Sequence, residues 1–182
     1  MIMDNKLIPL YRERESYTFF YEQQNNVLYK LQHRNKSFGL FFIFILGMTW
    51  ASELISDIYA NYQSSFLNII IFISAIGITY YLTDKFYHAY YNKETKREII
   101  LDKIKLQEYA VKGLKQLRIE FYSSIVSLPI SILFFIIFFS TSEIRPLIIG
   151  CIFLGVVLIL AFMKPLSRKK LLKKFEDKMI EL

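Results

Sequence analysis

The stretch FYSSIVSLPISILFFIIFFSTS, residues Phe121–Ser142, contains no charged side chain and is rich in phenylalanine, isoleucine and serine. A bilayer core about 30 Å thick requires roughly 20 apolar residues to be crossed by an α-helix. Phe121–Ser142 meets that length. Three more uncharged stretches meet it or nearly do: Phe38–Ser52, extendable to Tyr59 past two carboxylates, Tyr62–Thr83 and Pro146–Met163. The sequence therefore predicts four transmembrane helices.

The positions of lysine and arginine predict the topology of these helices in the membrane. Of 23 such residues, only Arg145 lies in one of the two short connections within the helix pairs. Since Lys and Arg accumulate on the cytoplasmic side, we expect both termini and the middle segment to be cytoplasmic. The predicted protein is all-α and polytopic, in the cell inner membrane. Its segments are a cytoplasmic N-terminal helix (1–37), a transmembrane hairpin (38–83), a cytoplasmic helical hairpin (84–120), a second transmembrane hairpin (121–163) and a basic cytoplasmic tail (164–182).

Composition agrees with one membrane-embedded unit rather than a soluble domain with an anchor. The chain has 182 residues, 54% of them hydrophobic, and a net charge of +7. Because the basic residues follow the membrane topology, their excess does not by itself indicate nucleic-acid binding, and we expect none. The bilayer is the first predicted partner.

The middle segment is expected to form a cytoplasmic layer. Tyrosines from Tyr80 to Tyr91 predict that the second membrane helix continues past the bilayer. A further helix is predicted over Lys96–Arg118, preceded by a turn with Thr95 and Glu98 in capping-box spacing. Its apolar arc is wide for a solitary amphipathic helix, so it should pack both on its own hairpin and on another subunit. One side of the arc, a candidate partner-binding stripe, comprises Ile100, Ile104, Val111 and Leu114, and the adjoining side comprises Leu106, Tyr109, Ala110 and Leu117.

The two terminal segments are the other cytoplasmic elements. A helix is predicted over Tyr11–Arg34, either along the membrane surface or covering the cytoplasmic hairpin. The tail carries the run Arg168, Lys169 and Lys170. We expect this run to anchor the topology beside anionic lipid, with docking of a cytoplasmic protein as the alternative.

Two carboxylates interrupt the first apolar stretch. Glu53 and Asp57 are four residues apart, which places them on one side of a helix near the outer membrane boundary. Burying a charge at membrane depth is costly, so they are either a cation- or proton-attracting site or a structural group that reaches the headgroups or pairs with Arg145. Asn68 and Glu143 lie at the same level and complete a candidate outer-rim cluster.

Small residues at four-residue spacing predict where the membrane helices approach closely. These positions are Gly47 and Ala51 on the first helix, Ser123, Ser127 and Ser131 on the third, and Cys151 and Gly155 on the fourth. Close packing is the main interpretation of this pattern, and a hydroxyl-lined polar path is the alternative.

Nothing in the sequence predicts catalysis. His33 and His88 have no Cys, Asp or Glu at metal-ligand spacing, so no metal site is expected. Neither a catalytic triad nor a phosphate-binding loop is present. We therefore expect a non-enzymatic protein without a cofactor.

In its layout of four apolar stretches with minimal outer loops, the chain resembles the small four-helix membrane subunits of prokaryotic anti-phage defence systems, of which the Kiwa type is one. That resemblance implies an inner-membrane sensor or effector that holds a cytoplasmic partner. The predicted function is a homo-oligomeric sensor, effector or pore subunit. Two alternatives remain open: an immunity or accessory protein that binds a membrane-targeting toxin or a transporter, and an anchor that recruits a soluble enzyme.

Overall fold

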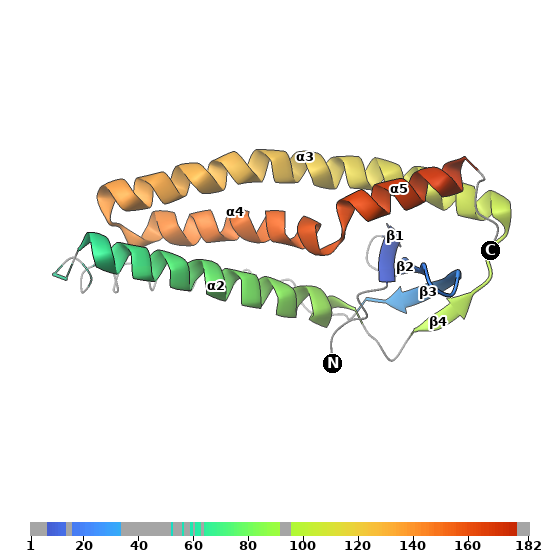
Figure 1. Cartoon of the computed structure of the whole chain (residues 1–182), viewed down its shortest axis with the longest axis horizontal. Coiled ribbons are helices and arrows are strands. Elements are labelled where there is room, and N and C mark those ends of the chain that lie inside the picture. The colour runs from blue at the N-terminus through green and yellow to red at the C-terminus, as the bar shows by residue number, and fades with distance from the viewer. Residues whose placement is uncertain are drawn as a thin grey trace. The chain divides into compact units, whose positions relative to one another are not determined.

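The computed structural model describes residues 7–13, 16–33, 52, 56, 59, 61–62, 64–91 and 96–177. The chain divides into two compact units. The first, here called the sheet unit, comprises residues 1–35, 85–122 and 159–182, and the second, the apolar unit, comprises residues 36–84 and 123–158. In chain order the elements are β1 (Leu7–Glu13), β2 (Tyr17–Glu22), β3 (Val27–Gln32), α2 (Ser65–Tyr90), β4 (Arg97–Ile99), α3 (Lys103–Thr141), α4 (Ile144–Phe162) and α5 (Pro165–Glu176), as labelled in Figure 1.

The prediction of an all-α fold is wrong, because the sheet unit contains a four-stranded antiparallel sheet in the order β1-β2-β3-β4. β2 and β3 lie within the range Tyr11–Arg34 where a helix was predicted, and β1 ends there. Aromatic and β-branched residues dominate β2, and such residues favour strands. The turn between β2 and β3 ends at Asn26, whose φ of 54° is a left-handed conformation that asparagine tolerates.

Both faces of this sheet are covered, which explains why the strands do not show the usual polar and apolar alternation. Along β2, Phe19 and Tyr21 belong to one hydrophobic cluster, whereas Phe20 between them belongs to another. A strand that is buried on both faces presents a continuous apolar run, which periodicity alone does not distinguish from a helix. The first cluster adds residues of α3 and α5: Leu106, Ala110, Leu117, Leu171, Leu172 and Phe175. The second includes Tyr87, Tyr91 and Met163.

The segment predicted over 84–120 differs from the structure in where its second helix begins. α2 does continue to Tyr90, which confirms the predicted extension of that helix. However, Glu98 lies in β4, which pairs with β3, and the next helix begins only at Lys103. A capping box there is therefore excluded, and Thr95 lies outside the described residues. The helix then runs to Thr141 without a break.

Three described helices, α2, α3 and α4, are long and apolar enough to cross a membrane. In each helix, no more than 28% of the most apolar stretch of 18 residues is buried within the molecule. Large apolar side chains such as Phe66, Ile73 and Leu133 are exposed instead, a surface that suits lipid rather than water. Of the first predicted membrane stretch with its extension, Ser52, Ser56 and Tyr59 alone are described.

Candidate functional site

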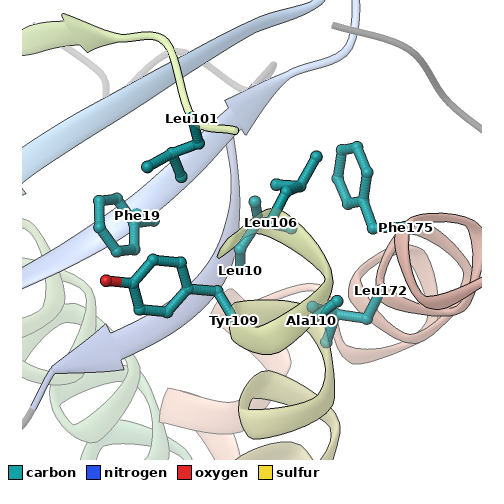
Figure 2. Close-up of a pocket in the computed structure, with 8 residues that line it drawn as sticks. All are labelled: Leu10, Phe19, Leu101, Leu106, Tyr109, Ala110, Leu172 and Phe175. Atoms are coloured by element: carbon teal, nitrogen blue, oxygen red, sulfur yellow. The ribbon is translucent and has the colours of Figure 1, made fainter. Parts of the chain in front are cut away.

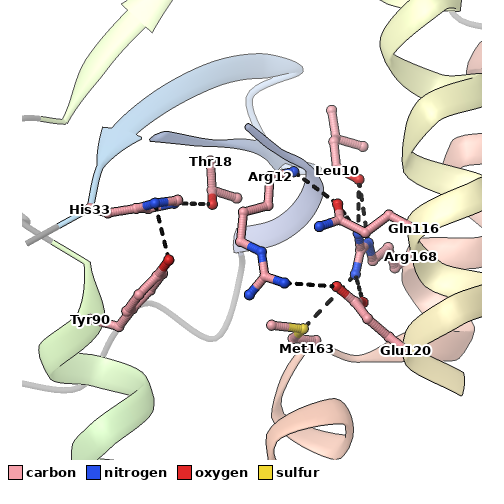
Figure 3. Close-up of polar contacts among 9 residues, drawn as sticks. All are labelled: Leu10, Arg12, Thr18, His33, Tyr90, Gln116, Glu120, Met163 and Arg168. Carbon is pink, nitrogen blue, oxygen red and sulfur yellow. Dashed lines mark hydrogen bonds and ion pairs between the residues drawn. The ribbon is translucent and has the colours of Figure 1, made fainter. Parts of the chain in front are cut away.

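The most unusual feature of the sheet unit is a buried arginine beside an irregularity in β1. Pro9 pairs with Phe20 and Tyr11 pairs with Phe19, so Leu10 has no partner residue in β2. Such a bulge takes a backbone carbonyl out of the ladder. The side chain of Arg168, on α5, is 2% exposed and donates two hydrogen bonds to the Leu10 carbonyl, from Nε at 3.3 Å and Nη2 at 3.2 Å (Figure 3).

The same guanidinium also binds α3. Its Nη1 donates to Oε2 of Glu120 at 2.7 Å, and its Nη2 lies 3.4 Å from Oε1 of Gln116. Nη1 also lies 3.9 Å from the Met163 sulfur. Three acceptors on two other elements are within reach because the guanidinium is a planar fork with five N–H donors, which a lysine would not replace. α5 is thus tied to both β1 and α3.

Arg12 completes this network from the strand side. Its backbone N–H donates to Gln116 Oε1 at 3.0 Å, and its Nη2 lies 3.7 Å from Glu120 Oε1. Glu120 is therefore held between two arginines, while its side chain keeps 17% of its surface exposed. The five residues Leu10, Arg12, Gln116, Glu120 and Arg168 are called the arginine network below.

α3 approaches the bulge so closely that only glycine fits at the crossing. A Cβ atom added to Gly113 would lie 2.6 Å from the Leu10 carbonyl oxygen and 2.9 Å from Cδ2 of Leu172. Backbone and a buried leucine therefore leave no room for a side chain at this point. β1, α3 and α5 meet at one junction, and the arginine network provides its polar contacts.

A second polar group lies around His33, which is buried at the end of the strand region. Its Nε2 is 2.8 Å from Thr18 Oγ1 and its Nδ1 is 3.1 Å from the Tyr90 hydroxyl (Figure 3). Its ring also packs against those of Tyr90 and Tyr91. Burial raises the pKa of Tyr91 to about 12. The group joins the sheet to the end of α2 and offers no pair of carboxylates, no exposed nucleophile and no ligand set.

The sheet unit also has a small apolar pocket, lined by Leu10, Phe19, Leu101, Leu106, Tyr109, Ala110, Leu172 and Phe175 (Figure 2). Its volume is about 10 Å³, close to the minimum that a single water needs. All of its lining side chains are apolar apart from the Tyr109 hydroxyl. We interpret it as a packing gap between α3, α5 and the sheet rather than a ligand site.

The predicted partner-binding residues fall in different environments. Ile100, Ile104 and Val111 are 95, 75 and 49% exposed, whereas Leu114 packs against the hydrophobic cluster. On the adjoining side of α3, Leu106, Ala110 and Leu117 are buried in the hydrophobic cluster, and Tyr109 is half-buried against it.

The three residues of the basic run in the tail also differ in their exposure to solvent. Lys169 and Lys170 are exposed, whereas Arg168 is buried in the arginine network and is not available to a partner. Arg168 was not recognised as a structural residue from the sequence. A signal was nevertheless present, because in a helix it shares one face with Leu171, Leu172 and Phe175. Nothing local marked Gln116 or Glu120 as its partners.

Part of the predicted outer-rim cluster can be placed. Asn68 on α2 is buried, and its Nδ2 donates to Ser142 Oγ at 2.9 Å in the turn between α3 and α4. Glu143 and Arg145 are exposed at that turn. Glu53 and Asp57 lie outside the described residues.

The predicted packing faces are also partly described. Ser127 and Ser131 are buried, Ser123 is exposed, and Cys151 and Gly155 are half-buried. α3 and α4 approach closely at Gly150, a glycine that the four-residue spacing did not indicate. Its carbonyl accepts a hydrogen bond from Ser131 Oγ at 2.8 Å. A Cβ atom there would lie 2.6 Å from the Phe135 ring. Gly47 and Ala51 lie outside the described residues.

Among the described residues, no group of three or more His, Cys, Asp or Glu side chains is arranged to hold a metal ion. Comparison with known proteins gives no further assignment: no protein-family model, no curated protein and no solved structure matches the chain.

Proposed function

We propose that this protein is a non-enzymatic, multi-pass inner-membrane protein that self-assembles and couples its membrane helices to a cytoplasmic protein partner. In this proposal the sheet unit is cytoplasmic and receives the partner, and the apolar unit lies in the bilayer. The layout resemblance to anti-phage defence subunits makes such a defence system the biological setting that we propose.

The observation that carries this proposal is the continuity of α3. Its 39 residues include both a mixed segment packed against the sheet and an apolar stretch long enough to cross a membrane. Glu120 is the last charged residue before that apolar stretch, and it is bound by Arg168 and Arg12. A force on the sheet or on α5 would therefore act on α3 next to the start of its apolar part. A continuous helix transmits such a displacement with no loop to absorb it.

The exposed apolar stripe supports a protein partner. Ile100 and Ile104 are 95 and 75% exposed, the first being the most exposed large apolar side chain among the described residues. Exposed apolar side chains in an aqueous layer are typical of a protein contact. We assign the partner contact to Ile100, Ile104 and Val111.

The proposal is tested with the full-length protein purified in mild detergent. We expect a mass above that of one 21.7 kDa chain, and a co-purifying protein that is lost in Ile100→Asp/Ile104→Asp. Lys105→Gln/Lys115→Gln is the matched control, since both lysines are exposed on α3 and the net charge falls by the same amount. A monomer, or a partner retained equally by both variants, would contradict the proposal. Ion flux through the purified protein in liposomes would instead favour a pore.

A further inference from the structure

α5 has a second face that the arginine network does not use. Lys169, Lys170, Lys173 and Lys174 are all exposed, while Arg168, Leu171, Leu172 and Phe175 are buried. At about 100° per residue, the four lysines cover an arc of about 140° around the helix. None of them forms an ion pair within the part of the chain that the structure describes. This basic face is complementary to an anionic partner.

An exposed leucine lies inside this basic arc. Leu166 is 77% exposed and projects between the directions of Lys169 and Lys170, one turn nearer the start of α5. The acidic residues Glu176 and Asp177 come only at the opposite end of the helix, about 15 Å farther along it. The helix therefore changes from apolar to basic to acidic along its length.

Chain connectivity decides which end of α5 is near the membrane under the proposed location. α4 is one of the helices apolar enough to cross a bilayer, and it ends at Phe162. α5 begins at Pro165, so at most about 10 Å of backbone separates the two helices. Leu166 is thus held close to the end of a membrane span, with the lysines following it and the acids farthest away. This order matches the approach to an anionic membrane surface, where the apolar residue enters first and the lysines meet the headgroups.

We infer that the outer face of α5, formed by Leu166, Lys169, Lys170, Lys173 and Lys174, binds anionic phospholipid headgroups. The inference rests on the membrane location proposed above and adds the chemistry of a specific ligand. The inner face of α5 carries Arg168, which binds both β1 and α3. Anionic lipid would therefore contact the helix that holds these two elements together. A soluble acidic protein is the competing occupant, and the test includes it.

The test uses the full-length protein in nanodiscs of phosphatidylcholine and phosphatidylglycerol. A fluorescent donor is attached at Ser167→Cys in a Cys151→Ala background, since Cys151 is the one cysteine of the chain. Energy transfer is measured to a trace of either phosphatidylglycerol or phosphatidylcholine that carries a headgroup acceptor. We expect more transfer to phosphatidylglycerol, with a preference that decreases with salt and by up to about fivefold for each lysine removed.

The variants are Lys169→Gln/Lys170→Gln and Lys173→Gln/Lys174→Gln, and the matched control is Lys105→Gln/Lys115→Gln, which changes the net charge equally on α3. Equal transfer to the two lipids, or an equal loss in the control, overturns the inference. Lysine-dependent binding of a soluble polyglutamate peptide without any lipid preference also overturns it, in favour of an acidic protein. Carbonate extraction of native membranes separates the two proposals: release of the protein contradicts the membrane location, whereas a retained protein without lipid preference contradicts the lipid site alone.

Discussion

Nη1 of Arg168 lies 2.7 Å from Oε2 of Glu120, and this ion pair joins the C-terminal helix α5 to α3. The arginine is 2% exposed, and its remaining donors reach the carbonyl of Leu10 at the β1 bulge. One side chain of α5 therefore binds two other elements, β1 and α3, that are far from it in the sequence. The stability of the sheet unit should depend on it far more than on the neighbouring lysines.

Replacement of Arg168 tests that dependence. Among the described residues, Arg168→Ala leaves Glu120 with only the longer contact to Arg12, and it removes both donors from the Leu10 carbonyl. Loss of one partner from a buried ion pair lowers the free energy of unfolding by about 3–5 kcal/mol. Arg168→Lys should recover only a small part of this loss, because an ammonium does not span the three acceptors.

The measurement for Arg168 is thermal unfolding of the purified protein in detergent, followed by circular dichroism. Lys169→Ala, at the exposed neighbouring position, is the control and should change the unfolding free energy by less than about 0.5 kcal/mol. Similar melting temperatures for Arg168→Ala and Lys169→Ala would show that the network does not stabilise the fold.

Gly113→Ala should destabilise the junction of β1, α3 and α5, although alanine is the better helix former. The added methyl would lie 2.6 Å from the Leu10 carbonyl oxygen, so α3 and the strand would have to separate. Overpacking of this kind costs about 1–3 kcal/mol. Thermal unfolding against Lys115→Ala, an exposed position on the same helix, measures the effect. A melting temperature above that of the unsubstituted protein would contradict the described approach of α3 to β1.

Within the apolar unit, the pair Gly150→Ala and Gly77→Ala separates helix packing from helix propensity. A Cβ at Gly150 would lie 2.6 Å from the Phe135 ring, whereas nothing lies within 4 Å of a Cβ at Gly77. Gly150→Ala should therefore lower the melting temperature in detergent, and Gly77→Ala should leave it unchanged or raise it. The packing of α3 on α4 would be refuted if both substitutions had the same effect.

The raised pKa of Tyr91 predicts that the folded protein loses stability at alkaline pH. Burial raises its pKa from 10.0 to about 12, so above pH 10 the unfolded chain loses this proton before the folded protein does. Its contribution is thus complete below pH 10 and is lost as the pH rises toward 12, at about 1.4 kcal/mol per pH unit.

Unfolding of Tyr91→Phe over the same pH range measures this contribution. Phenylalanine keeps the ring but has no hydroxyl to titrate, so the variant should gain stability relative to the unsubstituted protein as the pH rises from 10 toward 12. Parallel stability curves for the two proteins would exclude the contribution of Tyr91.

The apolar helices were predictable because their cause is local. A run of uncharged residues of sufficient length specifies a helix that can cross a bilayer, whatever its neighbours are. α2, α3 and α4 lie where such runs predicted helices. The extension of α2 to Tyr90 was likewise visible in the aromatic residues that follow the run.

The sheet was missed because its signal is not local. Phe19, Phe20 and Tyr21 form a continuous apolar run, since one face of β2 is covered by α3 and α5 and the other by Tyr87 and Tyr91. The run forms a strand buried on two sides because α3 and α5 pack on one face and Tyr87 and Tyr91 on the other. The turn residues Asn25 and Asn26 were the available indication of a hairpin.

Length and apolarity sufficient to enter a membrane can be identified in the sequence alone, because that property depends on each segment and not on its neighbours. Tertiary structure decided the roles of Arg168, Lys169 and Lys170, which are adjacent basic residues in the sequence. The rotation of α5 places the first against the Leu10 carbonyl and Glu120 and leaves the other two exposed. Buried polar groups require partners, and those partners lie 158 and 48 residues away along the chain.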